Sequence, residues 1–351
     1  MKAGIFDPYL DTLGGGERYT MTVAECLAKK GWAVDVFWDD ETLKPKLARR
    51  FGLSLNKVKF VRNFFAPKTS LRKRWQETKN YDLIFYLSDG SVPFLFGRKN
   101  ILHFQVPFQN VDGQTFLNKL KLKSIHHVVC NSQFTKKFID KEYGTKSLVV
   151  YPPVDVDNFH PDQKEKIILA VSRFSKTLHA KKQEVLITAF KKLKKIGGSQ
   201  WRLVLAGGLR SQDKSYFEAI KKKADGLPVE FLTNISFSQL KKLYGQGSIF
   251  WHAAGFEQDD PRLMEHFGIV VVEAMAAGCV PVVVGKGGIP EIVQSGVNGF
   301  LWQDKKKLVN LTLQLIKSPK MMKKMSIQAI KSSKKFGKKV FYQKIYELVK
   351  D

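Results

Sequence analysis

Short apolar runs alternate with longer amphipathic segments along the whole chain. The runs are nearly continuous in β-branched and other apolar residues, which is typical of parallel strands covered on both faces. The segments between them, such as 18–30 and 182–195, have apolar residues at helical spacing. This alternation predicts an α/β fold built on doubly wound parallel sheets. The expected strands are 3–6, 34–38, 57–61, 83–87, 101–105, 127–130, 167–172, 202–206, 229–232, 249–253 and 280–284.

A proline-rich segment, residues 151–161, interrupts this alternation. It begins Tyr-Pro-Pro-Val-Asp, and adjacent prolines keep the backbone extended and exclude a helix. With 351 residues, the chain is about twice as long as a typical domain. We therefore predict two domains, residues 1–154 and 155–335, whose strand ends face one another across a ligand-binding cleft. Residues 336–351 are expected to form a C-terminal helix that crosses back to the first domain.

The chain is strongly basic, with 59 Lys and Arg against 32 Asp and Glu, a net charge of +27. Such an excess favours a polyanionic partner, which can be a nucleic acid, an anionic membrane surface or a phosphorylated substrate. A solvated, lysine-rich surface is the alternative. Because the sequence contains no recognised nucleic-acid-binding module, we expect no nucleic-acid partner.

Cysteine usage and hydropathy favour a cytoplasmic protein. The three cysteines are scattered without metal-ligand spacing, which is typical of a reducing compartment. The N-terminus lacks the apolar run of a signal peptide. The most apolar stretch, 268–285, contains Glu273 and Pro281 and is therefore not a membrane span. Acidic pairs at 39–40 and 259–260 lack further ligands, so we expect no bound metal.

A glycine-rich loop, Leu-Gly-Gly-Gly-Glu-Arg at 13–18, follows the first expected strand and opens a helix. Backbone amides beside glycines at a helix N-terminus can hold an anion. The loop lacks the Gly-Lys-Ser/Thr of a P-loop and the strict spacing of a G-x-G-x-x-G motif. A simple turn is therefore the alternative.

The segment 265–278 is the second chemically informative one. Gly268 should lie at a helix start, where the amides of Ile269 and Val270 could hold a phosphate. Glu273 lies among apolar residues, with no Lys or Arg three or four positions away. A buried carboxylate is costly unless it accepts good hydrogen bonds, and the hydroxyls of a ribose would supply them. A carboxylate held by backbone amides for structural reasons is the alternative.

Glu265 and Glu273 form an E-x7-E pattern, and with it the chain resembles the retaining glycosyltransferases of family 4, glycosyl transferases group 1. Members of that family have the GT-B fold of two Rossmann-like domains. Residues 265–269, Glu-His-Phe-Gly-Ile, are similar to the branch that contains α-1,2-mannosyltransferases of lipid-linked oligosaccharide assembly. Six further segments match family motifs in order: 13–18, 131–135, 151–159, 171–174 with 181–183, 206–208 and 287–293.

The resemblance implies how the donor is bound. Arg173 and Lys181 would neutralise the nucleotide diphosphate as it leaves. Because the spacing between them is longer than the common family pattern, Lys182 is the alternative second cation, and ordinary surface ion pairing is the other interpretation. Glu273 would bind the ribose hydroxyls, and Glu265 would hold the donor sugar.

The resemblance also assigns roles to backbone groups and to the two domains. The backbone at Gly268, Ile269 and Val270 would bind the donor sugar and its phosphate. Gly15 and Gly16 would approach the diphosphate or the sugar from the opposite side. The first domain would face the acceptor, and the second would bind the nucleotide sugar.

Two histidines close expected strands. His103 ends a strand of the first domain at the level of the cleft, and in the family a histidine near that place touches the donor sugar or a nearby phosphate. A core histidine with satisfied hydrogen bonds is the alternative. His252, which closes a strand of the second domain, allows the same two interpretations.

The reaction that the resemblance implies is retaining transfer without a protein nucleophile, a metal or a cofactor. A hexosyl unit would move from a nucleotide-diphosphate sugar, GDP-mannose or a UDP-sugar, to a hydroxyl of a glycan or lipid-linked acceptor in polysaccharide biosynthesis. The alternatives are another GT-B enzyme, such as a phosphorylase or a sugar-nucleotide epimerase, and a basic nucleic-acid-binding protein.

Residues 62–79 favour a membrane partner. They combine six basic side chains with Phe64, Phe65 and Trp75 and contain one acid. Such a segment can lie at an anionic membrane interface, with its aromatic rings in the headgroup layer. We therefore expect a protein that is peripheral on the inner face of the membrane. A solvated basic helix packed through its aromatics is the alternative.

Overall fold

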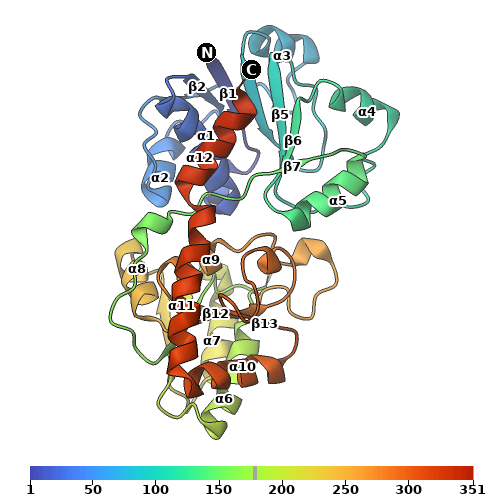
Figure 1. Cartoon of the computed structure of the whole chain (residues 1–351). Helices are drawn as coiled ribbons and strands as arrows, with labels where there is room; N and C mark the ends of the chain where they lie inside the picture. The colour runs from blue at the N-terminus through green and yellow to red at the C-terminus, as the bar shows by residue number, and fades with distance from the viewer. Residues whose placement is uncertain (177–179, 351) are drawn as a thin grey trace. The chain divides into compact units, whose positions relative to one another are not determined.

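The computed structural model describes residues 1–176 and 180–350 (Figure 1). These residues form two compact units. The first contains Met1–Pro153 and the C-terminal helix α12 (Lys338–Val349), and the second contains Val154–Gly337. Both units are built on parallel sheets with helices between the strands, so the fold class predicted from the alternating apolar runs is confirmed. Which unit faces the acceptor and which binds the nucleotide sugar remains a prediction.

The sheet of the first unit has, in the described chain, seven parallel strands in the order β3-β2-β1-β4-β5-β6-β7. The edge strand β7 was not predicted, because a two-residue strand has no periodicity to detect. The strands are β1 (Lys2–Phe6), β2 (Ala33–Phe37), β3 (Val58–Val61), β4 (Leu83–Leu87), β5 (Lys99–Phe104), β6 (His127–Cys130) and β7 (Leu148–Val149). The helices are α1 (Gly15–Lys29), α2 (Leu43–Phe51), α3 (Leu71–Thr78), α4 (Phe116–Leu122), α5 (Gln133–Tyr143) and α12.

Helices cover both faces of this sheet (Figure 1). Successive strand residues point to opposite faces, and Ile84 and Phe85 of β4 accordingly belong to different apolar clusters. On the face of Phe85, α1, α2 and α12 pack on the strands, with Phe341 of α12 buried. On the face of Ile84, Tyr143 of α5 is buried and Leu122, at the end of α4, is partly buried.

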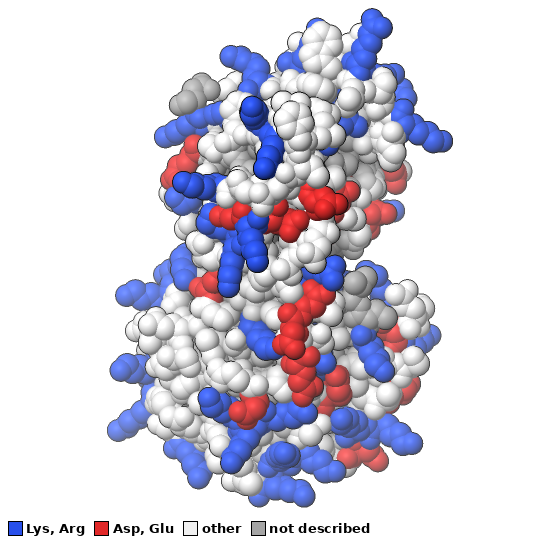
Figure 2. Space-filling view, turned by 90° about the vertical axis from the view of Figure 1, so that its right-hand side faces the viewer, with Lys and Arg blue, Asp and Glu red and all other residues white. Residues whose placement is uncertain are grey.

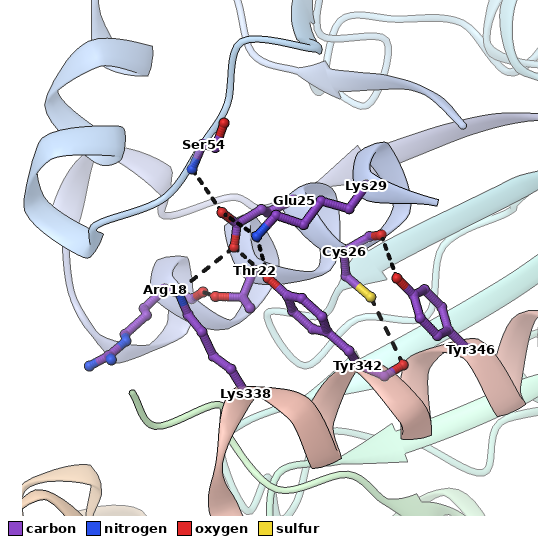
Figure 3. Close-up of polar contacts among 9 residues, drawn as sticks. All are labelled: Arg18, Thr22, Glu25, Cys26, Lys29, Ser54, Lys338, Tyr342 and Tyr346. Atoms are coloured by element: carbon purple, nitrogen blue, oxygen red, sulfur yellow. Dashed lines mark hydrogen bonds and ion pairs between the residues drawn. The ribbon is translucent and has the colours of Figure 1, made fainter. Parts of the chain in front are cut away.

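Polar contacts add to the packing of α12 against α1 (Figure 3). Glu25 of α1 is only 2% exposed and accepts the Tyr342 hydroxyl at 2.5 Å and the Ser54 amide at 2.8 Å. The Tyr346 hydroxyl donates to the Cys26 carbonyl at 3.2 Å. Burial raises the pKa of Glu25, but these hydrogen bonds and two nearby lysines outweigh it, so the pKa is lowered. The last helix therefore belongs to the first unit through both apolar and polar contacts.

The sheet of the second unit has, among the residues described, six parallel strands in the order β10-β9-β8-β11-β12-β13. The edge strand β13 was not predicted. The strands are β8 (Ile167–Val171), β9 (Arg202–Gly207), β10 (Val229–Thr233), β11 (Ile249–His252), β12 (Val280–Val284) and β13 (Phe300–Trp302). The helices are α6 (Gln183–Ile196), α7 (Lys214–Lys223), α8 (Phe237–Gln246), α9 (Ile269–Ala276), α10 (Lys305–Lys317) and α11 (Pro319–Ser333). Short 3-10 helices are η1 (Leu10–Thr12) in the first unit, and η2 (Val156–Asn158), η3 (Ser211–Asp213), η4 (Pro261–Leu263), η5 (Ile289–Glu291) and η6 (Lys334–Phe336) in the second.

The basic side chains are widely distributed. Figure 2 shows lysine and arginine over the visible face of both units rather than gathered in one patch. Of the helices in the described chain, none combines the length and the apolar character that crossing a bilayer requires.

Candidate active site

The segment after β8 places Arg173 at the carboxyl edge of the second sheet. The backbone of this segment lies against the backbone of the segment after β9, because the Phe174 amide donates to the Gly208 carbonyl at 2.9 Å. A Cβ atom on Gly207 would lie 1.8 Å from the Ser172 carbonyl oxygen, so glycine is required there. The Arg173 side chain is exposed and forms no ion pair with any described residue. Its guanidinium is therefore available to an anionic ligand.

Lys181 and Glu265 form an ion pair in the second unit. Lys181 Nζ lies 2.7 Å from Glu265 Oε2, and His252 Nε2, at the end of β11, lies 3.3 Å from the same oxygen. Burial raises the pKa of Glu265, but Lys181 and His252 outweigh it, and the pKa lies well below its ordinary value. Lys182 precedes α6 in a left-handed conformation, φ 56°. Of the two candidate lysines, Lys181 is thus the one that contacts Glu265.

A glycine pair fixes the backbone on which Glu265 is placed. The Gly288 amide donates to the Glu265 carbonyl at 2.8 Å. A Cβ atom on Gly287 would lie 2.2 Å from that carbonyl oxygen, and one on Gly288 would lie 2.2 Å from the His266 carbonyl oxygen. Gly287 also has a positive φ of 65°, which side chains other than glycine rarely adopt. The motif at 287–293 therefore supports the first glutamate of the E-x7-E pattern.

Helix α9 begins immediately after Gly268, where the sequence predicted a helix start. Gly268 precedes the helix with a φ of 112°, and Val271 and Val272 donate to its carbonyl oxygen. Ile269 and Val270 are half-buried, and the first amides of a helix have no acceptor within it. Gly268, Ile269 and Val270 therefore present backbone donors at the positive end of the helix.

Glu273 is buried on the same helix, with 6% of its surface exposed. The Tyr244 hydroxyl, from α8, donates to Glu273 Oε2 at 3.1 Å, and Tyr244 itself has no exposed surface. The sequence predicted no protein partner for the Glu273 carboxylate, so the prediction was incomplete. Residues 29 positions apart on different helices leave no local signal that would pair them.

The glycine-rich loop of the first unit differs from a simple anion site. The Gly14 amide, just before α1, is capped by the Glu17 carboxylate, which is 5% exposed. Gly15 begins α1, and a Cβ atom on Gly16 would lie 2.8 Å from the Gln105 side-chain oxygen. Burial raises the pKa of Glu17. The loop thus carries a carboxylate of its own where the sequence suggested room for a ligand anion.

Asp7, at the end of β1, is a second buried carboxylate beside this loop. It accepts the Thr20 hydroxyl at 2.6 Å and the Tyr9 amide at 2.9 Å, and it is 1% exposed. Burial and the nearby Glu17 carboxylate raise its pKa to about 7. The sequence assigned no role to Asp7; its position between the first expected strand and the glycine-rich loop was the available signal.

His103 is a core residue in this structure. It has no exposed surface, its Nδ1 lies 3.1 Å from the Val129 carbonyl oxygen, and its ring stacks on Tyr19 with centroids 4.1 Å apart. Burial lowers its pKa to about 3. Nε2, however, is buried without a hydrogen-bond partner among the described residues, so the alternative of a core histidine with satisfied hydrogen bonds is met only at Nδ1. The contact of His103 with the donor remains a prediction. His252 is also buried, but it lies beside Glu265.

Comparison with protein families decides the class of protein. The sequence model of the family Glycosyl transferases group 1 matches residues 155–332, and that of Glycosyltransferase Family 4 matches residues 13–158. The chain belongs to the glycosyl transferases group 1. The family resemblance carried by the E-x7-E pattern and the six further motifs is thereby confirmed.

Individual relatives are similar over part of their length. A "GDP-Man:Man(3)GlcNAc(2)-PP-Dol alpha-1,2-mannosyltransferase" from Xenopus tropicalis is 33% identical over 153 residues, which cover 41% of this chain and 30% of that enzyme. The O-antigen chain mannosyltransferase RfbU of Salmonella typhimurium is 29% identical over 193 residues, or 53% of this chain and 49% of that protein. The match thus spans less than half the length of either relative.

Solved structures share the fold over nearly the entire chain. A glycosyltransferase from Rickettsia africae has a TM-score of 0.78 and 19% identity, covering 99% of this chain and 97% of its own. HepE from Anabaena, solved with UDP and glucose, has a TM-score of 0.74 and 20% identity, covering 99% and 98%. These similarities place the chain in the GT-B fold.

Proposed function

We propose that this glycosyltransferase is a retaining, metal-independent enzyme that transfers a hexosyl unit from a nucleotide-diphosphate sugar to a hydroxyl of a glycan or lipid-linked acceptor. The observation that carries the proposal is the second unit's arrangement of Glu265 beside Lys181, with Glu273 and the α9 N-terminus following on the same segment. GDP-mannose is the first candidate donor, because the Xenopus and Salmonella relatives are mannosyltransferases. A UDP-sugar is the second, since HepE was solved with UDP and glucose.

The cationic groups suit a diphosphate leaving group. Arg173 is exposed without an ion pair among the described residues, whereas Lys181 already pairs with Glu265. An ammonium group has three donors, so Lys181 can keep Glu265 and still donate to a phosphate oxygen. Fixed positive charge at the point where negative charge develops lowers the transition-state energy.

The proposed reaction exchanges one bond at the anomeric carbon of the donor. The bond from this carbon to the diphosphate oxygen breaks, and its electron pair leaves with the nucleotide diphosphate. The acceptor oxygen forms the new bond on the same face, and its proton passes to the departing phosphate. The protein then contributes positioning and charge rather than a nucleophile. Glu273 would hold the ribose hydroxyls, and Glu265 a hydroxyl of the sugar.

The glycine-rich loop of the first unit is better suited to binding hydroxyl groups than to binding phosphates. Glu17 already caps the Gly14 amide, and Asp7 lies buried beside the same loop. A phosphate placed there would be repelled by carboxylate charge, whereas sugar hydroxyls can donate to it. We therefore propose that Gly15 and Gly16 face the sugar or the acceptor rather than the diphosphate.

The enzyme is proposed to act in the cytoplasm, at the inner face of a membrane that presents a lipid-linked acceptor. The basic composition, with a net charge of +27, supports this location because the cytoplasmic leaflet is anionic. Polysaccharide or glycolipid assembly is the corresponding process.

The test begins with ligand binding. Thermal-shift measurements with GDP-, UDP-, ADP- and dTDP-sugars should show a stabilising donor, because a ligand that binds only the native state raises the Tm. The stabilising donor is then incubated with lipid-linked acceptors, with and without EDTA, and the anomeric configuration of the product is read by NMR. Retention with EDTA present supports the proposal. Inversion, loss of activity with EDTA, or consumption of free phosphate in place of glycoside formation contradicts it.

A further inference from the structure

Helix α4 of the first unit exposes a cluster of large apolar side chains. Phe116 is 86% exposed, Leu117 50% and Leu120 48%, and none of the helix's residues is buried. Single exposed apolar residues are ordinary, but neighbouring ones on one short helix form a patch. This patch has no role in the transfer chemistry proposed above.

The patch occupies one side of the helix and is flanked by positive charge. With about 100° between successive residues, Phe116, Leu117 and Leu120 fall within an arc of roughly 100°. Lys119 and Lys123, both exposed, border the arc on one side. Lys121 borders it on the other, half-buried, with its ammonium 5.2 Å from the centre of the Phe94 ring.

The backbone holds α4 in place without help from the exposed side chains. The Thr115 hydroxyl caps the helix by accepting the Asn118 amide at 3.3 Å. The loop before it is tied to α5, because the Glu142 carboxylate accepts the amides of Asn110 and Val111 at 3.1 and 3.0 Å. Burial raises the pKa of Glu142, but the backbone hydrogen bonds outweigh it, so the pKa is lowered. The apolar side chains of α4 are therefore exposed on a helix whose backbone is fixed by hydrogen bonds to other residues.

The basic segment at 62–79 divides into a packed part and an exposed part. Arg74 lies 5.0 Å from the centre of the Phe65 ring, and Phe65 is buried, which fits the packed alternative considered from the sequence. Leu71 and Trp75 of α3 are 49% and 45% exposed. Phe65 and Leu122, at the end of α4, belong to the same apolar cluster.

We propose that α4 docks the first unit on an anionic lipid bilayer, with Phe116, Leu117 and Leu120 inserted at the level of the headgroups and the flanking lysines on lipid phosphates. An amphipathic helix with apolar residues between lysines is the arrangement that binds in the interface plane. A protein partner fits less well, because lysine is depleted from protein–protein interfaces. The proposal is independent of the transferase reaction.

Flotation with vesicles of phosphatidylcholine, alone or mixed equally with phosphatidylglycerol, tests the proposal on the full chain. Wild type should float with the anionic vesicles and much less with the zwitterionic ones. The variant F116S/L117S/L120S should bind the anionic vesicles about tenfold more weakly or worse, since each buried CH₂ group contributes to partitioning. The variant K119E/K123E should lose binding as well, and the wild-type interaction should weaken as salt is added.

A matched control tests whether vesicle binding depends on the α4 patch or on any exposed apolar side chain. The variant I196S/V297S/I327S removes three exposed apolar side chains of the second unit, which are 50%, 42% and 55% exposed, and should float like wild type. Equal flotation of wild type and F116S/L117S/L120S would overturn the proposal. A second copy of the chain is the other possible occupant of the patch. If F116S/L117S/L120S abolished self-association of the chain and left vesicle binding unchanged, the patch would be a contact between copies, and the proposal would be overturned.

Discussion

Lys181 Nζ lies 2.7 Å from Glu265 Oε2, and 84 positions of sequence separate the two residues. The pair joins the lysine of the predicted diphosphate clamp to the first glutamate of the E-x7-E pattern within one unit. A cation expected to face phosphate thus also fixes the carboxylate expected to face the sugar. Sugar binding and leaving-group stabilisation are therefore coupled in the proposed mechanism.

Replacing Lys181 should impair catalysis more than replacing its neighbour. We expect Lys181→Ala to lower kcat/KM by roughly 10²–10³-fold, since it removes charge stabilisation and leaves Glu265 without its ion pair. Lys182→Ala, which removes the same charge one residue away, should cost about tenfold or less. Steady-state kinetics with the donor identified by thermal shift checks both. A larger effect at Lys182 would transfer the role of second cation to that residue.

The hydrogen bond from the Tyr244 hydroxyl to Glu273 should increase the affinity for the donor, because it holds the Glu273 carboxylate in place. Tyr244→Phe removes the hydroxyl that donates to Glu273 at 3.1 Å and lies 3.4 Å from the Val270 carbonyl oxygen. A hydrogen bond to a carboxylate is worth about 1.5–3 kcal/mol, so the donor KM should rise while kcat changes little. Glu273→Ala should abolish transfer, because the ribose hydroxyls lose their acceptor. Inhibition by the nucleoside diphosphate and by its 2′-deoxy analogue provides the specific readout. Wild type should prefer the ribose form, and the Glu273 variant should bind both alike. Retained preference in that variant would remove Glu273 from the ribose site.

The fold class was predictable from the sequence, whereas several contacts of the predicted donor-site residues were not. Continuous apolar runs indicated all the strands except β7 and β13, which are edge strands too short to show a pattern. The E-x7-E spacing located Glu265 and Glu273 because both lie on one short segment. The partners Tyr244 and His252 come from other elements, and only tertiary packing brings them to the glutamates. The burial of His103 also depends on tertiary packing, since the Tyr19 ring that stacks on it comes from α1.

Asp7 should destabilise the protein increasingly as the pH rises. Its pKa in the folded chain is about 7, against 3.8 as the ordinary value, so the folded state binds the extra proton between these limits. Unfolding free energy therefore falls as pH rises from about 4 to 7, by up to about 4 kcal/mol for a shift of this size. Asp7→Asn should accordingly raise the Tm more at pH 8 than at pH 5. Asp112→Asn, which removes a charge from an exposed position elsewhere in the same unit, is the control and should show no such difference. An equal gain from both variants would mean that net charge alone is responsible.

The contact between Tyr342 and Glu25 should make the attachment of α12 sensitive to acid. Tyr342→Phe removes a hydrogen bond to a buried carboxylate and should cost about 1.5–3 kcal/mol at neutral pH. Tyr346→Phe, one turn later on the same helix, removes a hydrogen bond to the neutral Cys26 carbonyl and should cost about 0.5–1.5 kcal/mol. The pKa of Glu25 is lowered in the folded chain, so its stabilising contribution is present above the ordinary pKa of 4.5 and is lost as pH falls through the folded value.

The difference between these two tyrosine variants should therefore shrink in acid. Thermal unfolding over a pH series that falls from neutral through the lowered pKa of folded Glu25 measures it, and proteolysis near residue 337 reports whether α12 is released first. Because the two tyrosines share a helix and a packing face, changes in helix propensity and apolar contact largely cancel between the variants. A difference that stays constant over the pH range would show that the Tyr342 ring, rather than its hydrogen bond to the Glu25 carboxylate, holds the C-terminal helix on α1.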